Sequence, residues 1–513
     1  MIDMNRKNNN WIQRWVFGIL PFYLFTVLPL NARITLPSFF SDGMVLQQQT
    51  ECNIWGKSEA GKSIVIITSW DKKSYSTMVD QDGNFSVKVK TPKAGGPYDI
   101  TFALGTLSKS SKHSSGLAYD RTLHNILIGE VWICSGQSNM EMLMKGYKAQ
   151  PVEGAAEELL SCIDDGLRLY YGKRAARLEP QFDIAGAWKA ANAASVREFS
   201  ATAYFFGKAL RKSLGVPVGL ICTAFGGSAC EAWMKADWLK AFPKVQQTIT
   251  EEDVKKKQQR CPTALYNGQL KPLIGYGIRG AIWYQGEDNV PRYDYYAPLM
   301  ARMIQGWRED WQQGDFPFYY CQIAPFAYDE TDWALYNSAF LREQQEKVES
   351  LIPNCRMAVL MDTGIKDVIH PRKKRLAGER LALLALSHTY DVKGLPDFAK
   401  YKEVTFQNDT AVVAFDRSKE WVYFEHGSTS NNFEVAGNDQ VFHPATKVWV
   451  SRNRVYVISN HVKTPVAVRY AFKDWAVGDL MHDGLPVSSF RSDHWVPVPR
   501  TKTPVKGDYN NPK

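Results

Sequence analysis

Several features that mark large classes of protein are missing from this chain of 513 residues. No apolar run reaches the roughly 20 residues of a membrane-spanning helix, which excludes a polytopic membrane protein. Glycine (36 residues) and proline (25 residues) are not enriched, which excludes a collagen-like fibre and a long low-complexity linker. With 45% hydrophobic and 22% charged residues the chain is not disordered. At about 150 residues per domain, its length predicts about three domains.

Cysteine motifs are also absent, although the chain has eight cysteines. Their spacing is irregular and contains no C-x-x-C pair, so it indicates neither a zinc site nor a thioredoxin-like motif. Several of them lie within apolar strand-like runs, where a free cysteine behaves as a small buried hydrophobe. We expect mainly buried thiols, with a disulfide framework as the alternative, and we predict no metal and no cofactor.

The positive charge of the chain is not gathered in one place. The net charge is +9, but lysine and arginine are mixed with acidic residues along most of the sequence. A nucleic-acid-binding protein more often concentrates its basic residues on one face or in one tail. We therefore expect no nucleic-acid partner, and the sequence leaves the oligomeric state open.

The N-terminus has the pattern of a secretory signal. Three basic residues in the first 14 positions precede an uncharged run over residues 15–30, and Ala32 offers a small residue at a cleavage site. The run is shorter than a spanning helix, although a signal anchor remains the alternative. We expect residues 1–32 to be a signal peptide and the mature protein to be periplasmic or extracellular, with no stable membrane insertion after cleavage.

The hydrophobic pattern divides the rest of the chain into three regions. Residues 33–124 and 391–513 consist of short β-like runs between turn signals, and each predicts a β domain. Residues 125–390 alternate between apolar strands and amphipathic helices, which predicts an α/β domain with ligands at the carboxyl ends of its strands. Strands are expected at 131–134, 218–224, 280–284, 318–323 and 357–361, and helices at 200–214 and around 296–307.

A candidate nucleophile follows the first of these strands. Residues 131–134 run into Ser-Gly-Gln-Ser-Asn-Met, in which Ser138 lies on a tight turn at the carboxyl edge of the sheet. Backbone N–H groups of such a turn can also face a developing oxyanion. The pattern is not the G-x-S-x-G elbow and is by itself also typical of an ordinary turn, so Ser138 needs a partner.

The candidate base is found by counting histidines. A serine hydroxyl is a weak nucleophile without a base, and between residues 125 and 387 the only histidine is His370. It precedes Pro371, which we expect at the first position of a helix. Asp367, three residues earlier, can turn back to accept a hydrogen bond from the imidazole, as in a catalytic triad. The alternative is a helix-capping histidine beside a solvated aspartate.

Two further strand ends carry polar groups to the same edge. Gly226 and Gly227 follow the strand at 218–224, where glycine lets backbone N–H groups approach a ligand, although a plain tight turn is equally consistent. Gln285, with several carboxylates after it, follows the strand at 280–284. Four loops at one edge of one sheet converge as an active site would.

Together these motifs resemble the sialate O-acetylesterase family of carbohydrate esterases, within the SGNH hydrolase superfamily. The likeness is carried by GQSNM at 136–140, GGS followed by EAW at 226–233, WYQGE at 283–287 and D-x-x-H-P at 367–371. The resemblance implies an α/β fold, with an SGNH-type three-layer α/β/α domain around a mostly parallel sheet. It also implies flanking N- and C-terminal β-sandwich-like domains.

The resemblance further implies roles for individual residues. Ser138 would be the nucleophile, His370 the base and Asp367 its orienting acid. The oxyanion donors would be the N–H of Ser138, the N–H of a glycine and the side chain of Gln285. The glycine is Gly226 or Gly227, and we prefer Gly226. Candidate substrate contacts are Glu287 and Asn139, with a structural role as the alternative for Glu287. Asp288 departs from the family pattern, because relatives often carry serine there.

The function implied is hydrolysis of O-acetyl esters on carbohydrates through an acetyl-serine intermediate, with O-acetylated sialic acids as the first choice of substrate. The alternatives are an acetylxylan esterase and a non-catalytic carbohydrate-binding protein. The basic run at residues 372–375 could attract the carboxylate of a sialic acid, although we favour a solvated helix face. Most of the aromatic residues are expected in the core.

Overall fold

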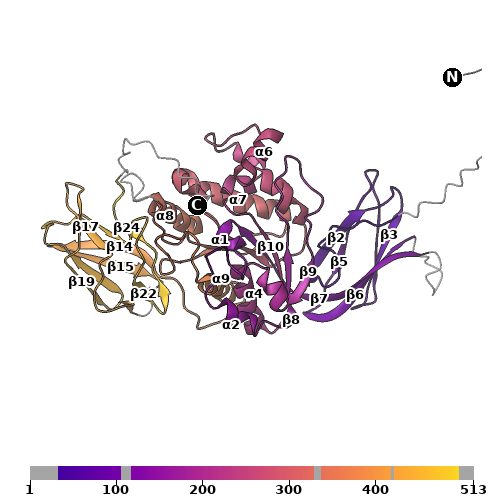
Figure 1. The fold of residues 1–513 in the computed structure, drawn as a ribbon, viewed down its shortest axis with the longest axis horizontal. Helices are drawn as coiled ribbons and strands as arrows, with labels where there is room; N and C mark the ends of the chain where they lie inside the picture. Colours follow the sequence, from indigo (N-terminus) through magenta and orange to yellow (C-terminus); the bar gives the residue numbers. More distant parts are fainter. Residues whose placement is uncertain (1–32, 106–116, 329–336, 418–420, 496–513) are drawn as a thin grey trace, which may run out of the picture.

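The computed structural model describes residues 33–105, 117–328, 337–417 and 421–495. The predicted signal peptide, residues 1–32, lies outside the described residues. Figure 1 shows an elongated molecule with a β region at each end and an α/β domain between them. Within the described ranges, none of the helices has both the length and the apolar character needed to cross a bilayer.

The central domain is built on a sheet with the strand order β13-β12-β11-β7-β10-β8-β9. Every neighbouring pair is parallel except β8 and β9. The parallel strands are almost entirely buried because helices cover both faces. The strands are β7 (Ala118–Gly136), β8 (Asp164–Tyr171), β9 (Trp188–Ala191), β10 (Val218–Ala224), β11 (Gly280–Tyr284), β12 (Phe318–Cys321) and β13 (Cys355–Ala358).

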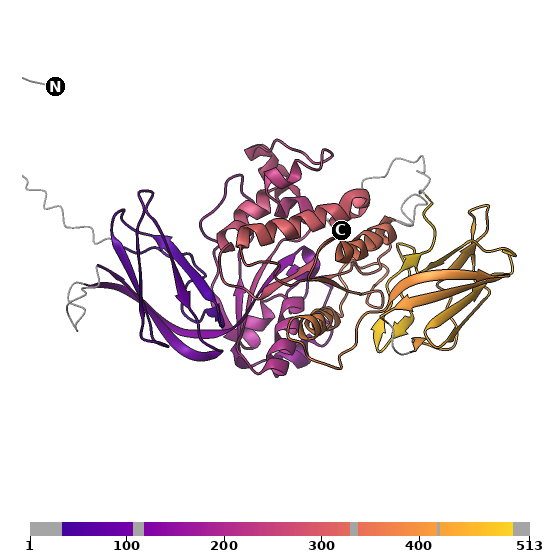
Figure 2. The ribbon, with the colours of Figure 1, turned by 180° about the vertical axis from the view of Figure 1, so that it is seen from behind.

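Two pairs of long helices cover the sheet, as seen from either side in Figures 1 and 2. On one face α4 (Ala201–Leu214) packs against α9 (Lys374–His388), and Phe206 of α4 contacts Trp132 of β7 with 5.1 Å between ring centroids. On the other face α7 (Tyr296–Trp311) packs against α8 (Asn337–Leu351), and Trp307 meets Trp283 of β11 at 5.7 Å. These contacts make the three-layer α/β/α arrangement.

The N-terminal β region is continuous with the central sheet through β7. The first part of this 19-residue strand pairs with β6, and its middle pairs with β1. Its last residues pair with β10 and β11. The predicted boundary between residues 124 and 125 therefore lies inside one strand. The other strands of this region are β1 (Val45–Gln47), β2 (Glu51–Lys57), β3 (Ser63–Thr68), β4 (Ser74–Met78), β5 (Asn84–Lys90) and β6 (Gly95–Leu104).

The C-terminal β region contains three antiparallel sheets with the orders β14-β15-β20-β19, β18-β17-β21-β24 and β16-β22-β23. It is joined to the α/β domain by contacts to α8, in which Arg491 pairs with Glu343 and Arg342 donates to Ser489. Its strands are β14 (Lys400–Gln407), β15 (Thr410–Asp416), β16 (Val422–Phe424), β17 (Phe433–Ala436), β18 (Phe442–Pro444), β19 (Lys447–Ser451), β20 (Arg454–Ile458), β21 (Ala467–Tyr470), β22 (Leu480–His482), β23 (Leu485–Pro486) and β24 (Phe490–Arg491).

The predicted α/β strands and the helices at 200–214 and 296–307 are confirmed. Several bounds differ: the strand expected at 318–323 ends at Cys321, the strand expected at 357–361 is Cys355–Ala358, and the helix expected from Pro371 begins at Lys374. All eight cysteines are buried free thiols. The shorter helices and turns are α1 (Ser138–Glu141), α2 (Ala155–Leu159), α3 (Ala193–Arg197), α5 (Ala236–Leu239), α6 (Glu251–Lys257), η1 (Cys230–Trp233), η2 (Gln258–Arg260), η3 (Tyr266–Leu270), η4 (Lys271–Leu273) and η5 (Glu287–Tyr295).

Candidate active site

The Ser138 turn is shaped by a close contact between two neighbouring strands. Gly136, the last residue of β7, has φ +141°, and a Cβ there would lie 2.2 Å from the carbonyl oxygen of Tyr284. Only glycine fits this position. The next N–H, from Gln137, donates to the same carbonyl at 2.9 Å. The chain then turns into α1, so that Ser138 stands partly exposed at the carboxyl edge of the sheet.

His370 lies beside this turn, in the segment that joins β13 to α9. Its ring packs edge-on against Tyr147 with 5.0 Å between centroids, and Tyr147 Oη donates to the carbonyl oxygen of Ser138 at 3.2 Å. Asn139 Nδ2 also donates to the carbonyl of Ile369 at 3.2 Å. Ser138 and His370 therefore share one neighbourhood, although no hydrogen bond joins their side chains among the contacts of the described residues.

The imidazole of His370 is held in one tautomer by Gln150. Its Nδ1 lies 2.7 Å from Gln150 Oε1, which can only accept a hydrogen bond, so Nδ1 carries the proton and Nε2 is left as the basic nitrogen. Burial lowers the pKa of His370 to about 4, and the positive charge of Lys374 contributes in the same direction. The ring is therefore neutral at pH 7 and able to accept a proton.

Asp367 is not brought to the imidazole. It lies on an exposed turn closed by the Val368 N–H, which donates to the Ile365 carbonyl at 3.3 Å. No hydrogen bond from His370 to Asp367 occurs in the described part of the chain. The nitrogen expected to face Asp367 faces Gln150 instead, because the turn directs the carboxylate toward solvent.

The two glycines after β10 differ in what their N–H groups can do. Gly226 lies against the nucleophile, since a Cβ there would be 3.5 Å from Ser138 Cβ. Its N–H is already engaged, donating to Glu141 Oε2 at 2.9 Å. Gly227, with φ +70°, makes no N–H hydrogen bond within the described residues, and the same holds for the N–H of Ser138. The preference for Gly226 as an oxyanion donor is therefore not supported, and Gly227, the other glycine named from the sequence, is the one whose N–H is open.

Glu141 is buried and held by Arg174, which donates to it from both Nε and Nη2. The Arg174 guanidinium also lies over the ring of Phe225, 4.9 Å from its centroid. This ion pair fixes the loop after β10 against α1. Neither residue was identified from the sequence, since nothing in the local pattern of either one indicates the contact.

Gln285 is also fully occupied. Its Nε2 donates to the Ser228 carbonyl at 3.0 Å and to Asn289 Oδ1 at 2.7 Å, while its Oε1 accepts from Tyr296 Oη at 2.8 Å. The side chain has no exposed surface. The Gln285 amide uses its N–H groups to join the loops after β10 and β11 and leaves none of them open. Its predicted role as an oxyanion donor is therefore not supported.

Asn139 and Glu287 belong to a buried polar network rather than to an open surface. Asn139 is fully buried and donates to Glu287 Oε1 at 2.5 Å, and its Oδ1 accepts from Lys374 Nζ. Burial raises the pKa of Glu287 and lowers the pKa of Lys374 to about 7. Asn139 and Glu287 are both buried, so the predicted role of these two residues as substrate contacts is not supported. Lys374 was expected on a solvated helix face and is instead buried.

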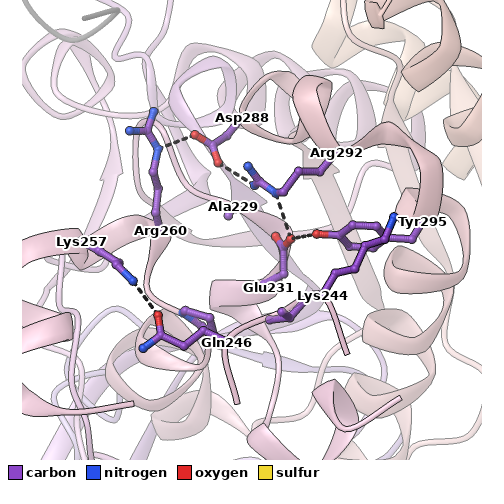
Figure 3. Close-up of a pocket in the computed structure, with 11 residues that line it drawn as sticks. Ala229, Glu231, Lys244, Gln246, Lys257, Arg260, Asp288, Arg292 and Tyr295 are labelled. Carbon is purple, nitrogen blue, oxygen red and sulfur yellow. Dashed lines mark hydrogen bonds and ion pairs between the residues drawn. The ribbon is translucent and has the colours of Figure 1, made fainter. Parts of the chain in front are cut away.

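A pocket lies beside the loops that follow β10 and β11 (Figure 3). It has a volume of about 190 Å³. The N–H of Asp288, which lines it, donates to Oε1 of Gln137, the residue before Ser138, at 3.4 Å. No group of three or more His, Cys, Asp or Glu side chains suited to a metal ion occurs in the described ranges. The pocket is lined by Ala229, Glu231, Lys244, Val245, Gln246, Lys257, Arg260, Pro262, Asp288, Arg292 and Tyr295.

Comparison with known proteins identifies the family. Residues 128–383 match the family model described as "Carbohydrate esterase, sialic acid-specific acetylesterase". A solved carbohydrate acetylesterase from Xanthomonas citri is 33% identical, with a TM-score of 0.80 over 90% of this chain and 100% of that chain. The chain belongs to the sialate O-acetylesterase family. The protein is a carboxylic ester hydrolase, and its family is one of carbohydrate esterases.

Mammalian members of the sialate O-acetylesterase family align over most of the chain. The rat sialate O-acetylesterase is 24% identical over 85% of this chain and 89% of its own length. The human enzyme is 26% identical over 74% of this chain and 75% of its own length. The matched family region runs from the middle of β7 into α9 and so contains every candidate site residue.

Proposed function

We propose that the protein removes O-acetyl groups from sialic acids, with Ser138 as nucleophile and His370 as general base. The observation that carries the proposal is that a partly exposed serine and a neutral imidazole, whose Nδ1 is held by Gln150, lie in segments joined through Tyr147 and Asn139. A base must be unprotonated to accept the serine proton, and the low pKa of His370 supplies that state at neutral pH. The sialic acid specificity named in the family description supports the choice of substrate.

The proposed reaction has two steps. Ser138 Oγ attacks the acetyl carbonyl carbon while its proton passes to His370 Nε2, and the sugar oxygen leaves with that proton. Water then attacks the acetyl-serine and gives a proton to His370, which passes it to Ser138 Oγ as acetate is released. The oxyanion is stabilised in both steps by the N–H groups of Ser138 and of Gly227 in the loop after β10, neither of which makes a hydrogen bond within the described residues. Removing one such donor typically costs about 10²–10³ in kcat.

Gln150 takes the orienting role in this proposal. A residue that fixes the imidazole tautomer needs only an acceptor at Nδ1, and an amide oxygen supplies one without adding charge. A triad in which Asp367 performs this task requires the turn at 365–368 to reorient toward His370. The two arrangements make opposite predictions for substitutions at Gln150 and Asp367.

The experiment is acetate release by purified protein from O-acetylated sialic acid and from acetylxylan. We expect hydrolysis of the sialic acid ester and, in Ser138→Ala, a loss of at least about 10³-fold in kcat with unchanged thermal unfolding. Ser161→Ala, an exposed serine in a turn, is the matched control and should retain full activity. Preference for acetylxylan would contradict the substrate, and no acetate release from any acetyl ester would favour a binding protein.

We also propose that residues 1–32 direct export and are removed. The basic start, the uncharged run over residues 15–30 and the small residue Ala32 support this. N-terminal sequencing of the protein recovered from the periplasm or medium should begin at Arg33. Recovery of the intact N-terminus in a membrane fraction would instead support the signal anchor.

A further inference from the structure

The pocket in Figure 3 is lined by residues of the chain between β10 and β11 and of the loop after β11. Ala229 and Glu231 follow β10, three and five residues after Gly226, which lies against Ser138. Asp288 and Arg292 follow β11. Both segments start at the carboxyl edge of the sheet, the edge at which Ser138 also lies.

The charged side chains of the pocket are mostly engaged with one another. Arg292 donates from Nη2 to Asp288 Oδ2 at 3.1 Å and from Nε to Glu231 Oε1 at 3.4 Å. Lys244 pairs with Asp294, and Lys257 donates to Gln246 Oε1 at 2.5 Å. These contacts satisfy the two acids, the two lysines and one of the two arginines.

Arg260 is the exception. Its Nε donates to Asp288 Oδ1 at 2.5 Å, and neither Nη1 nor Nη2 forms a hydrogen bond within the described residues. Figure 3 shows these two terminal nitrogens pointing away from Asp288, and the side chain is 47% exposed. Asp288 therefore holds the guanidinium by one edge and leaves its outer pair of N–H groups open. That pair matches the two oxygens of a carboxylate.

We propose that Arg260 binds the carboxylate of the acidic sugar and so selects sialic acids over neutral acetylated sugars. This inference rests on the proposed function, because it names the subsite that recognises the substrate. Asp288 is a positioning residue here, since it orients Arg260 without contacting the sugar. Lys257 and Lys244 add positive charge around the site.

The kinetic test compares an acidic substrate with its neutral counterpart. Wild type and Arg260→Gln are assayed on O-acetyl-N-acetylneuraminic acid and on the methyl ester of its carboxylate. Losing a charge-assisted pair at a half-exposed site should raise KM for the acid about tenfold, and KM for the methyl ester should stay the same. Arg260→Lys, which keeps the charge but lacks the paired donors, should fall between the two.

The control variant is Arg454→Gln, which removes the same charge from an exposed position on β20. It should behave as wild type on both substrates. Equal effects of Arg260→Gln on the acid and on the methyl ester, or no effect on either, would overturn the proposal. A kcat change without a KM change would do the same, because a carboxylate contact away from the ester should act on binding.

A binding experiment separates this inference from the proposed function. Ser138→Ala protein is titrated with N-acetylneuraminic acid and with its methyl ester, followed by NMR. We expect the acid to bind at least about fivefold more tightly, and Arg260→Gln in the same background to remove the difference. If wild type does not hydrolyse acetylated sialic acids but this difference is found, the proposed substrate fails and the carboxylate site stands. Equal affinity for acid and methyl ester overturns the site whatever the activity.

Discussion

The pH at which activity falls on the acid side of the pH–rate profile should reflect the low pKa of the buried His370. Burial lowers its pKa from the ordinary 6.5 to about 4. At pH 5.5 an ordinary histidine is about 9% neutral, whereas one with a pKa of about 4 is about 97% neutral, a difference of about tenfold in active base. The value of kcat/KM for a neutral ester should therefore stay level from pH 8 to about 5 and fall by half near pH 4.

The assay is hydrolysis of 4-nitrophenyl acetate in buffers of constant ionic strength, with the background of Ser138→Ala subtracted. The substrate has no group that titrates in this range, so the limb belongs to the free enzyme. Circular dichroism at each pH separates protonation from unfolding. An acid limb near pH 6.5 in folded protein would refute the reasoning, because the group that titrates would then not be a buried His370 acting as the proposed base.

The same pKa shift carries a consequence for stability. The folded pKa lies below the unfolded one, so between about pH 6.5 and pH 4 the unfolded chain binds a proton that the folded protein does not. The contribution of His370 to the free energy of unfolding is therefore full above pH 6.5 and falls as the pH drops toward 4. The difference between the ordinary pKa of 6.5 and the folded pKa of about 4 corresponds to about 3 kcal/mol, which is an upper figure because the ring is only partly enclosed.

Three further predictions follow from neighbouring contacts. Lys374→Met should raise the midpoint pH of the acid limb, because it removes a positive charge that lowers the pKa of His370. The control Lys373→Met changes an exposed neighbour and should leave the midpoint unchanged. Equal profiles for the two variants would contradict an effect of Lys374 on the His370 pKa. Gln150→Leu should lower kcat at least about tenfold and Asp367→Asn by less, and the reverse order would restore Asp367 as the orienting acid. Gly136→Ala should destabilise the fold by at least about 2 kcal/mol in denaturant unfolding, because its Cβ would overlap the Tyr284 carbonyl; a smaller loss would show that this turn can relax.

The sequence by itself indicated the parallel strands β7, β10, β11, β12 and β13 of the central sheet and the candidate pair Ser138 and His370. The strands at 218–224 and 280–284 were predicted to the residue because fully buried parallel strands are continuous apolar runs between turn signals. Ser138 followed from its place directly after such a strand. His370 followed from composition, as the only histidine between residues 125 and 387. Strands β8 and β9 were missed, and β8 begins with two aspartates that mask the apolar residues of its second half.

Only the tertiary structure decided which atoms meet around that pair. Gln150 is 220 residues from His370, and no local pattern indicates that its amide oxygen would occupy the place expected for Asp367. In the same way Glu141 uses the N–H of Gly226, and Lys374 turns inward to Asn139. The backbone pattern places a side chain at the edge of a sheet. Its direction is set by the packing of segments that are distant in sequence, because buried polar groups must find partners wherever the fold brings them.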